Sequence, residues 1–206
     1  MPIRFIYFDL GNVLVNFNLK SVCGQIAAVA GVTADRVRTI LFDDGLEEEF
    51  ETGRIGEAEF FERFCAATGT QPDPVELKRA ASDIFALNVR IMPIVHGLRW
   101  AGNRMGILSN TCSIHWLHVA EGPFATLASF FHRHVLSYEV GAMKPDPLIY
   151  QAAIETAGVE PAEILFTDDR PENVVAAREM GIDAIHFTSP AKLLADLLKR
   201  EIPINI

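Results

Sequence analysis

The pattern of apolar and polar positions divides the chain into a helical block and a block in which strands and helices alternate. Residues 5–15 open with an apolar, β-branched and aromatic run that predicts a strand buried on both faces, and turn residues follow Asp9 at once. Helical spacing then predicts four helices, at 19–31, at 34–44, after Gly56 and over about 75–87. We therefore expect residues 17–88 to be entirely helical.

From residue 91 onward, helix and strand patterns follow each other in strict alternation. Helices are predicted at 92–102, from 113, at 146–157, 171–181 and 190–200, and strands at 104–109, 133–137, 163–167 and 183–187. Such alternation predicts right-handed crossovers and a parallel sheet. The predicted fold class is α/β: a doubly wound parallel sheet with a Rossmann-like core, formed by residues 1–16 and 89–206, with residues 17–88 inserted as an α-helical cap over the strand ends.

Composition narrows the classes of partner. The chain has 206 residues, half of them apolar, and a formal net charge of −9 with no run of Lys and Arg, which argues against nucleic-acid binding. Three cysteines without a CxxC pair predict neither a disulfide framework nor a zinc site. No apolar segment approaches the length of a membrane span. We expect a cytoplasmic protein, monomer or homodimer, with a small-molecule partner, no nucleic acid and no membrane contact.

Polar residues that could bind a ligand or take part in catalysis occur at four predicted strand ends. They are Asp9, the pair Ser109 and Asn110, the residue Lys144, and the pair Asp168 and Asp169. In an open parallel sheet the carboxyl ends of the strands meet at one edge, where ligands bind. These side chains are therefore predicted to converge on one crevice.

Each residue type has a physical task in such a crevice. The carboxylates of Asp9, Asp168 and Asp169 would repel one another unless a divalent cation neutralised them, and hard oxygen ligands of this kind suit Mg²⁺. Lys144 precedes Pro145, which favours an extended backbone and a fixed direction for the ammonium. The hydroxyl of Ser109 and backbone N–H groups at the start of the next helix can bind phosphate oxygens.

Each of these residues also has an ordinary structural alternative. Asp9 could serve a turn or cap a helix, residues 109–111 could be an N-cap, and Asp168 or Asp169 could cap the helix that Pro171 begins. Lys144 could be a surface lysine. The functional interpretation is favoured because all four groups occur together, in this order, after successive strands.

Four motifs resemble those of the haloacid dehalogenase superfamily of phosphohydrolases, in the branch with a helical cap after the first strand. The motifs are residues 8–14 (FDLGNVL), 108–111 (LSNT), 143–146 (MKPD) and 166–173 (FTDDRPEN), and the resemblance extends over essentially the whole chain. The pattern is especially similar to the subgroup that includes bacterial α-glucose-1-phosphate phosphatases. The resemblance implies a Mg²⁺-dependent phosphatase that hydrolyses a small phosphorylated metabolite, of the sugar-phosphate type, through an aspartyl-phosphate.

The resemblance also implies a role for each matched residue. Asp9 would be the nucleophile, and Mg²⁺ would be held by Asp9, the backbone carbonyl of Gly11 and Asp169, with Asp168 acting indirectly. Lys144 would neutralise charge on Asp9 and on the transferring phosphoryl group. Ser109 and Asn110 would orient that group.

Gly11 departs from the family pattern, which usually has a second Asp two residues after the nucleophile to protonate the leaving group. General acid catalysis contributes roughly 10²–10⁴ in rate, so its loss is serious. Two alternative functions stay open. One is a haloacid dehalogenase in which Asp9 attacks carbon, and the other is a non-catalytic sensor of a phosphorylated ligand.

Weaker candidates lie outside these motifs. His115, with Trp116 beside it, is predicted to line the crevice near the cap and to contact substrate. His115 and His118 could also share a helix face as metal ligands, although no third ligand is visible in the sequence nearby. The run Glu47–Glu49 is predicted to be a solvated face, and Arg54 is predicted to form a salt bridge.

Overall fold

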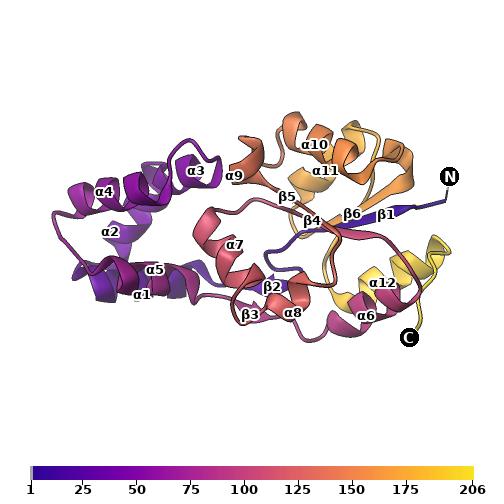
Figure 1. Cartoon of the computed structure of the whole chain (residues 1–206), viewed down its shortest axis with the longest axis horizontal. Helices are drawn as coiled ribbons and strands as arrows, with labels where there is room; N and C mark the ends of the chain where they lie inside the picture. Colours follow the sequence, from indigo (N-terminus) through magenta and orange to yellow (C-terminus); the bar gives the residue numbers. More distant parts are fainter. Residues whose placement is uncertain (1) are drawn as a thin grey trace.

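The centre of the molecule is a five-stranded, all-parallel sheet (Figure 1). The computed structural model describes residues 2–206, so residue 1 of the predicted core segment lies outside it. In the strand order β5-β4-β1-β6-β7, the strands are β1 (Phe5–Phe8), β4 (Met105–Ser109), β5 (Arg133–Leu136), β6 (Ile164–Asp168) and β7 (Asp183–His186). The predicted parallel sheet is therefore confirmed.

The register of the sheet brings the predicted functional residues to one edge. Phe8 of β1 is paired with Ile107 of β4 on one side and with Thr167 of β6 on the other. The chain builds β4 and β5 on one side of β1, and β6 and β7 on the other, so the strand order reverses at β1. A ligand crevice is expected at such a reversal, beyond the carboxyl ends of the strands.

Helices cover both faces of the sheet, as a doubly wound fold requires. One face packs against α6 (Met92–Trp100), α7 (Ser113–Ala120), α8 (Ala125–Ala128) and α12 (Pro190–Lys199), and the other packs against α10 (Pro147–Ala157) and α11 (Pro171–Glu179). Successive side chains of β1 alternate between these two cores, because strand side chains point to opposite faces. Two short helical segments, α9 (Ser137–Val140) and η2 (Pro161–Glu163), complete the connections.

A second group of helices lies beyond the carboxyl ends of the strands, at the left of Figure 1. It contains α1 (Leu19–Ala30), α2 (Ala34–Arg38), the π-helical turn η1 (Thr39–Asp43), α3 (Leu46–Glu51), α4 (Glu57–Thr68) and α5 (Pro74–Ser82). Their apolar faces form a separate core, which Cys112 and Ile114 join from the start of α7. Helix α1 has a capping residue at each end. The Asn18 side chain accepts hydrogen bonds from two backbone N–H groups at its start, and Gly31, with φ 68°, ends it in the left-handed conformation.

The first strand ends at Phe8, directly before Asp9, as the pattern predicts, and the chain then turns at Asn12, whose φ is 54°. One prediction about local structure was wrong. Residues 17–88 are not entirely helical, since Ala86–Leu87 (β3) pairs antiparallel with Val15–Asn16 (β2). Strands of two residues show no periodicity, and their pairing joins segments about 70 positions apart in the chain, so the sequence pattern could not reveal them.

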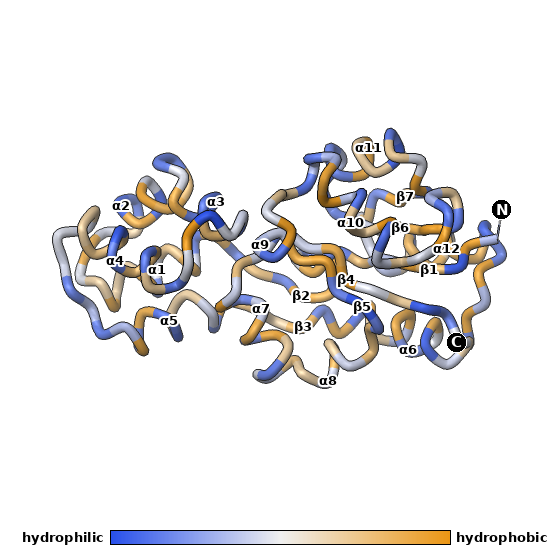
Figure 2. Tube along the Cα trace, turned by 45° about the horizontal axis from the view of Figure 1, so that its top comes forward, coloured by the Kyte–Doolittle hydropathy of each residue, from blue (hydrophilic) through white to orange (hydrophobic). Residues whose placement is uncertain are grey.

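Helix α3 was not predicted as a separate element. It is a short helix with three consecutive glutamates in its first turn, and the tube in Figure 2 is strongly hydrophilic there, whereas the central strands are largely hydrophobic. Within residues 2–206, no helix combines the length and the apolar character needed to cross a bilayer.

Candidate active site

Asp9 lies directly after β1 and is only 7% exposed. The ammonium of Lys144 donates to its Oδ1 at 2.6 Å, to Oδ2 of Asp168 at 2.7 Å and to the Leu108 carbonyl at 2.9 Å. Three acceptors thus saturate the three N–H donors of this buried lysine and hold it between two strand ends. The alternative of a surface lysine is excluded, because Lys144 is 4% exposed.

Burial and charge act against each other in this group. Burial raises the pKa of Asp9 to about 7, the ammonium of Lys144 opposes the increase, and the carboxylates of Asp168 and Asp169 add to it. Burial by itself would lower the pKa of Lys144, but the carboxylates of Asp9 and Asp168 outweigh burial, and the pKa of Lys144 is raised. Lys144 therefore carries a positive charge, and this single ammonium interacts with the carboxylates of both Asp9 and Asp168.

The two neighbouring carboxylates of the acidic pair have different surroundings. Asp168 is fully buried, and it accepts hydrogen bonds from the Asn173 side-chain amide at 3.0 Å and from the Arg170 backbone N–H at 2.8 Å, in addition to Lys144. Asp169 is half-buried and lines the cavity described below. Burial raises the pKa of Asp169 and Asp168 adds to the increase, whereas a hydrogen bond from the Asn12 side chain opposes it.

The chemistry of this donor set fits a divalent cation. One carboxylate oxygen from each of Asp9, Asp168 and Asp169 lies within 4.8 Å of the other two. Hard oxygen ligands in such a cluster suit Mg²⁺, and a cation would offset both the burial and the carboxylate repulsion that raise the pKa of Asp9. Asp169, with its open side toward the cavity, is the member of the pair that is free to ligate directly.

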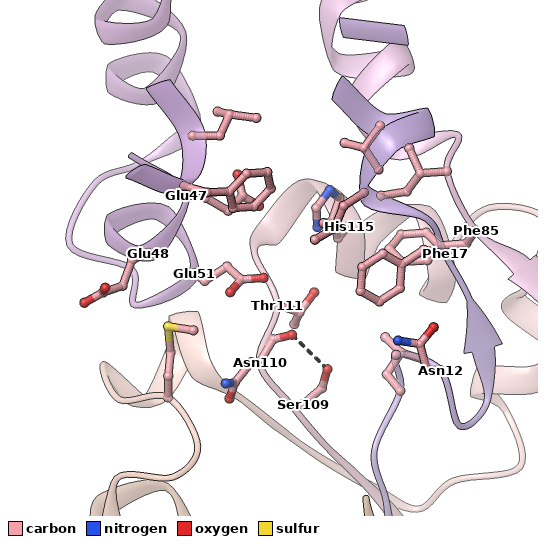
Figure 3. Close-up of a pocket in the computed structure, with 18 of the residues that line it drawn as sticks. Asn12, Phe17, Glu47, Glu48, Glu51, Phe85, Ser109, Asn110, Thr111 and His115 are labelled. Carbon is pink, nitrogen blue, oxygen red and sulfur yellow. Dashed lines mark hydrogen bonds between the residues drawn. The ribbon is translucent and has the colours of Figure 1, made fainter. Parts of the chain in front are cut away.

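Ser109 ends β4 and Asn110 follows it, at the same edge of the sheet (Figure 3). The Ser109 hydroxyl donates to the Asn110 carbonyl at 3.2 Å. The side chain of Asn110 forms two hydrogen bonds with the backbone of Lys144, at 2.7 and 2.9 Å. Asn110 thus fixes the loop that carries Lys144, and its side chain is more occupied than the sequence led us to expect.

The structure also decides the capping alternatives. The N-cap of α7 is Cys112, and no side chain caps this helix. The N-cap of α11 is Arg170, so neither Asp168 nor Asp169 holds that position. Asp146 does cap α10, accepting from the Leu148 N–H, and Pro147 is the first helical residue.

A cavity of about 420 Å³ separates these strand ends from the helices α1, α3 and α5. We call the residues at the strand ends its floor: Asp9, Ser109, Asn110, Lys144 and Asp169, which line the cavity, together with the buried Asp168, which is bonded to Lys144. We call the opposite side its roof, which consists of residues of the second helical group: Val22, Ile26, Leu41, Phe42, Glu47, Glu48, Glu51, Phe60, Ala81 and Ile84. The volume is within the range of about 300–1,000 Å³ that is usual for small-molecule sites.

Gly11 lies at the edge of the floor, beneath an aromatic side chain. A Cβ atom added to Gly11 would come within 2.9 Å of Cε1 of Phe17, whose ring packs edge-on against Phe85. Both rings border the cavity in Figure 3. The place of an acidic side chain at position 11 is therefore filled by an apolar ring.

His115 lines the cavity from α7, as predicted, and its Nε2 is 3.1 Å from the carbonyl of Ala81 in α5. Burial lowers its pKa to about 4, so the imidazole is neutral at physiological pH. The structure does not support the alternative in which His115 and His118 together hold a metal: in the described residues, the potential ligands grouped with His115 within 4.8 Å are Glu47 and Cys112.

The prediction of a solvated face at Glu47–Glu49 was also wrong for its first residue. Glu47 and Glu51, one helical turn apart on α3, both line the cavity. Glu48 also borders it, but its side chain is 64% exposed and lies 3.9 Å from Arg54. Burial raises the pKa of Glu47 to about 7, and burial together with the charge of Glu47 raises that of Glu51 to about 8. The i, i+4 spacing of these glutamates is the signal in the sequence that could have revealed them.

This arrangement places the chain among the α/β enzymes that work at the carboxyl ends of a parallel sheet. More particularly, the model of the haloacid dehalogenase-like hydrolases matches residues 3–181, and the chain belongs to this hydrolase family.

Individual relatives agree with the family assignment. The chain is 26% identical over 186 residues to a D-ribitol-5-phosphate phosphatase of Bacteroides thetaiotaomicron, covering 88% of this chain and 90% of that protein. It is 28% identical over 158 residues to a flavin mononucleotide hydrolase of Arabidopsis thaliana, covering 77% of this chain and 63% of that protein.

The fold matches a solved haloacid dehalogenase family enzyme from Bacteroides thetaiotaomicron with a TM-score of 0.82 and 27% identity, covering 91% of this chain and 95% of that one. A second structure of that enzyme, with a TM-score of 0.78 and 27% identity over 90% of this chain and 94% of that one, holds magnesium and inorganic phosphate.

Proposed function

We propose that this hydrolase is a Mg²⁺-dependent phosphatase that removes the phosphoryl group from a small metabolite of the sugar-phosphate or polyol-phosphate type. One observation carries the proposal: Asp9 lies at the floor of the cavity, bonded to the Lys144 ammonium at 2.6 Å and clustered with Asp168 and Asp169. A carboxylate nucleophile beside a fixed cation and a cluster of oxygen ligands is suited to phosphoryl transfer.

In the proposed reaction, an Asp9 oxygen attacks phosphorus, and the bond from phosphorus to the substrate oxygen breaks. Lys144 favours the ionised form of Asp9 and offsets the negative charge of the phosphoryl oxygens. Ser109, on the neighbouring strand end, orients the phosphoryl group. Water then hydrolyses the aspartyl-phosphate, which returns Asp9 and releases inorganic phosphate.

Asp9, Asp169 and the backbone carbonyl of Gly11 would hold the Mg²⁺ ion, with Asp168 supporting them through its bonds to Lys144 and Asn173. When bound, Mg²⁺ supplies positive charge that stabilises the phosphoryl oxygens. The magnesium and phosphate held by the solved relative support this assignment.

The helices of residues 17–88 are proposed to act as a cap that excludes water and selects the substrate. The relatives named for ribitol-5-phosphate and flavin mononucleotide support a phosphate monoester as substrate. The apolar side chains and the two carboxyls of the roof favour a neutral, hydroxyl-bearing substrate body over one that carries additional negative charge.

Phosphate release from a panel of sugar and polyol phosphates, with Mg²⁺ and with a chelator, tests the proposal. We expect release only with Mg²⁺ and none from Asp9→Asn. Release of halide from 2-haloacids without metal would favour a dehalogenase that attacks carbon. Binding of phosphorylated ligands without any turnover would favour a sensor.

A further inference from the structure

The proposed phosphatase lacks an acid at the position where it is usually found. Gly11 has no side chain, and the ring of Phe17 occupies the space above it. His115 cannot replace the acid, because its pKa is lowered to about 4 and it carries no transferable positive charge near neutral pH. A proton for the leaving group must come from another part of the cavity.

Two carboxyl groups of α3 face this cavity from the roof. Glu47 and Glu51 are four residues apart and therefore on one face of the helix. Within residues 2–206, neither side chain forms a hydrogen bond or an ion pair with another residue, although α3 also contains Glu49, which is bonded to Arg63 at 2.7 Å. Both carboxyls are thus available to a molecule in the cavity.

Glu51 is the better placed of the two. Figure 3 shows its carboxyl directed toward Asn110 and Thr111, above Ser109 at the floor. Lys144 and Arg170 line the same cavity, and their positive charges act on the carboxyl of Glu51. Glu47 lies one turn earlier, beside Cys112 and His115.

The surroundings of Glu51 also favour its protonated form near neutral pH. Burial and the neighbouring Glu47 raise its pKa to about 8, against the opposing charges of Lys144 and Arg170. A carboxyl group that keeps its proton at the working pH is what general acid catalysis requires.

We propose that Glu51 is the general acid of this enzyme, donating its proton from the roof to the leaving-group oxygen. The proposal rests on the phosphatase function proposed above. As Asp9 forms its bond to phosphorus, the bond from phosphorus to the substrate oxygen breaks, and that oxygen takes the proton of Glu51 and leaves as an alcohol. Glu51 is then a carboxylate.

The second step restores both groups. Glu51 removes a proton from the attacking water, whose oxygen bonds to phosphorus while the bond from phosphorus to Asp9 breaks. The products are inorganic phosphate, the Asp9 carboxylate and protonated Glu51, so the cycle closes without another reactant.

Single-turnover kinetics with the full chain and Mg²⁺ test this assignment. The rate of Asp9 phosphorylation is measured with an alkyl phosphate, whose leaving group needs a proton, and with p-nitrophenyl phosphate, whose leaving group does not. Glu51→Gln should slow the alkyl phosphate by about 10²–10⁴-fold and the aryl phosphate by less than about tenfold. The matched variant Glu49→Gln, on the same helix but outside the cavity and bonded to Arg63, should keep both rates within about tenfold of wild type, and Glu47→Gln should not show the selective loss.

The outcomes separate this inference from the function on which it rests. If wild type turns over both substrates and Asp9→Asn neither, but Glu51→Gln slows both equally or not at all, Glu51 is not the acid and the phosphatase function stands. If Glu47→Gln shows the selective loss, the assignment within α3 is overturned. If wild type turns over no phosphate ester with Mg²⁺, the proposed function fails and this inference fails with it. Melting temperatures of all variants establish that each is folded.

Discussion

The floor and the roof of the cavity differ in how their polar side chains are bonded to the rest of the protein. On the floor, Asp9, Asp168 and Lys144 are tied to one another by bonds of 2.6 and 2.7 Å, and Asn110 binds the Lys144 backbone at two points. On the roof, apolar side chains surround the carboxyls of Glu47 and Glu51, which have no polar partner within residues 2–206.

The difference in bonding indicates that the two sides of the cavity have different roles. Groups that must hold one geometry through a reaction are fixed by the sheet and by their mutual charges, and the cost of burying them is offset by these bonds. Groups that must meet a substrate are left without partners in the protein. The floor is therefore suited to the chemical step, and the roof to substrate contact and proton transfer.

The largest expected effect comes from the nucleophile on the floor. Asp9→Asn preserves the shape of the side chain but cannot attack phosphorus, so we expect phosphate release to fall on the order of 10⁴-fold or more. The exposed Asp44→Asn is a matched control that should retain activity. Residual turnover of Asp9→Asn near that of the control would place the chemistry elsewhere in the cavity.

Removing the cation of the floor should cost stability as well as activity. Lys144→Met leaves Asp9 and Asp168 buried without their partner, and breaking a buried ion pair typically costs about 3–5 kcal/mol of unfolding free energy. Urea unfolding at neutral pH measures the loss. Lys192→Met, which removes an exposed pair with Asp196, should cost at most about 1 kcal/mol. Similar losses in the two variants would show that the floor is not held by charge.

The metal assignment distinguishes two neighbouring residues of the floor. Mg²⁺ at a hundred times its dissociation constant should stabilise wild type by about 2.7 kcal/mol. Asp169→Asn should abolish this stabilisation, whereas Asp168→Asn should retain part of it, because Asp169 faces the cavity and Asp168 is bonded to Lys144 and Asn173. Thermal melts with and without Mg²⁺ provide the measurement. A normal Mg²⁺ shift in Asp169→Asn contradicts the assignment.

The roof should show the smallest effect, one that depends on pH. The pKa of Glu51 is raised from 4.5 to about 8, so the unfolded chain loses this proton at lower pH than the folded chain does. Wild type therefore loses stability relative to Glu51→Gln as pH rises from about 5 to about 8, and the difference is constant above that range. The full shift would correspond to about 5 kcal/mol, which solvent screening of this partly exposed side chain reduces to on the order of 1–2 kcal/mol.

Urea unfolding of both proteins across this range tests the trend, with the exposed Glu48→Gln as control. The charged and titratable groups that act on Glu51 are Glu47, Cys112, Lys144 and Arg170. A difference between wild type and Glu51→Gln that is independent of pH would show that this carboxyl is well solvated and would weaken the contrast between roof and floor.

The sequence by itself determined the order of strands and helices in the core and the residues at the strand ends. Periodicity is a local property, and the rule that parallel strands share one carboxyl edge needs no detail of packing, so the gathering of Asp9, Ser109, Lys144 and Asp168 could be predicted. The family also followed from these motifs and is confirmed. The roles of the individual site residues remain predictions.

Only the tertiary structure showed which side chains contact one another on the two sides of the cavity. The Lys144–Asp9 bond joins residues 135 positions apart, the ring of Phe17 covers Gly11, and Glu47 and Glu51 face inward from a short helix that reads as a solvated acidic run. The hydrophobic pattern shows that a helix has a buried face, but not what lies opposite that face. That depends on contacts between segments distant in the chain, which only the packing of the second helical group against the strand ends creates.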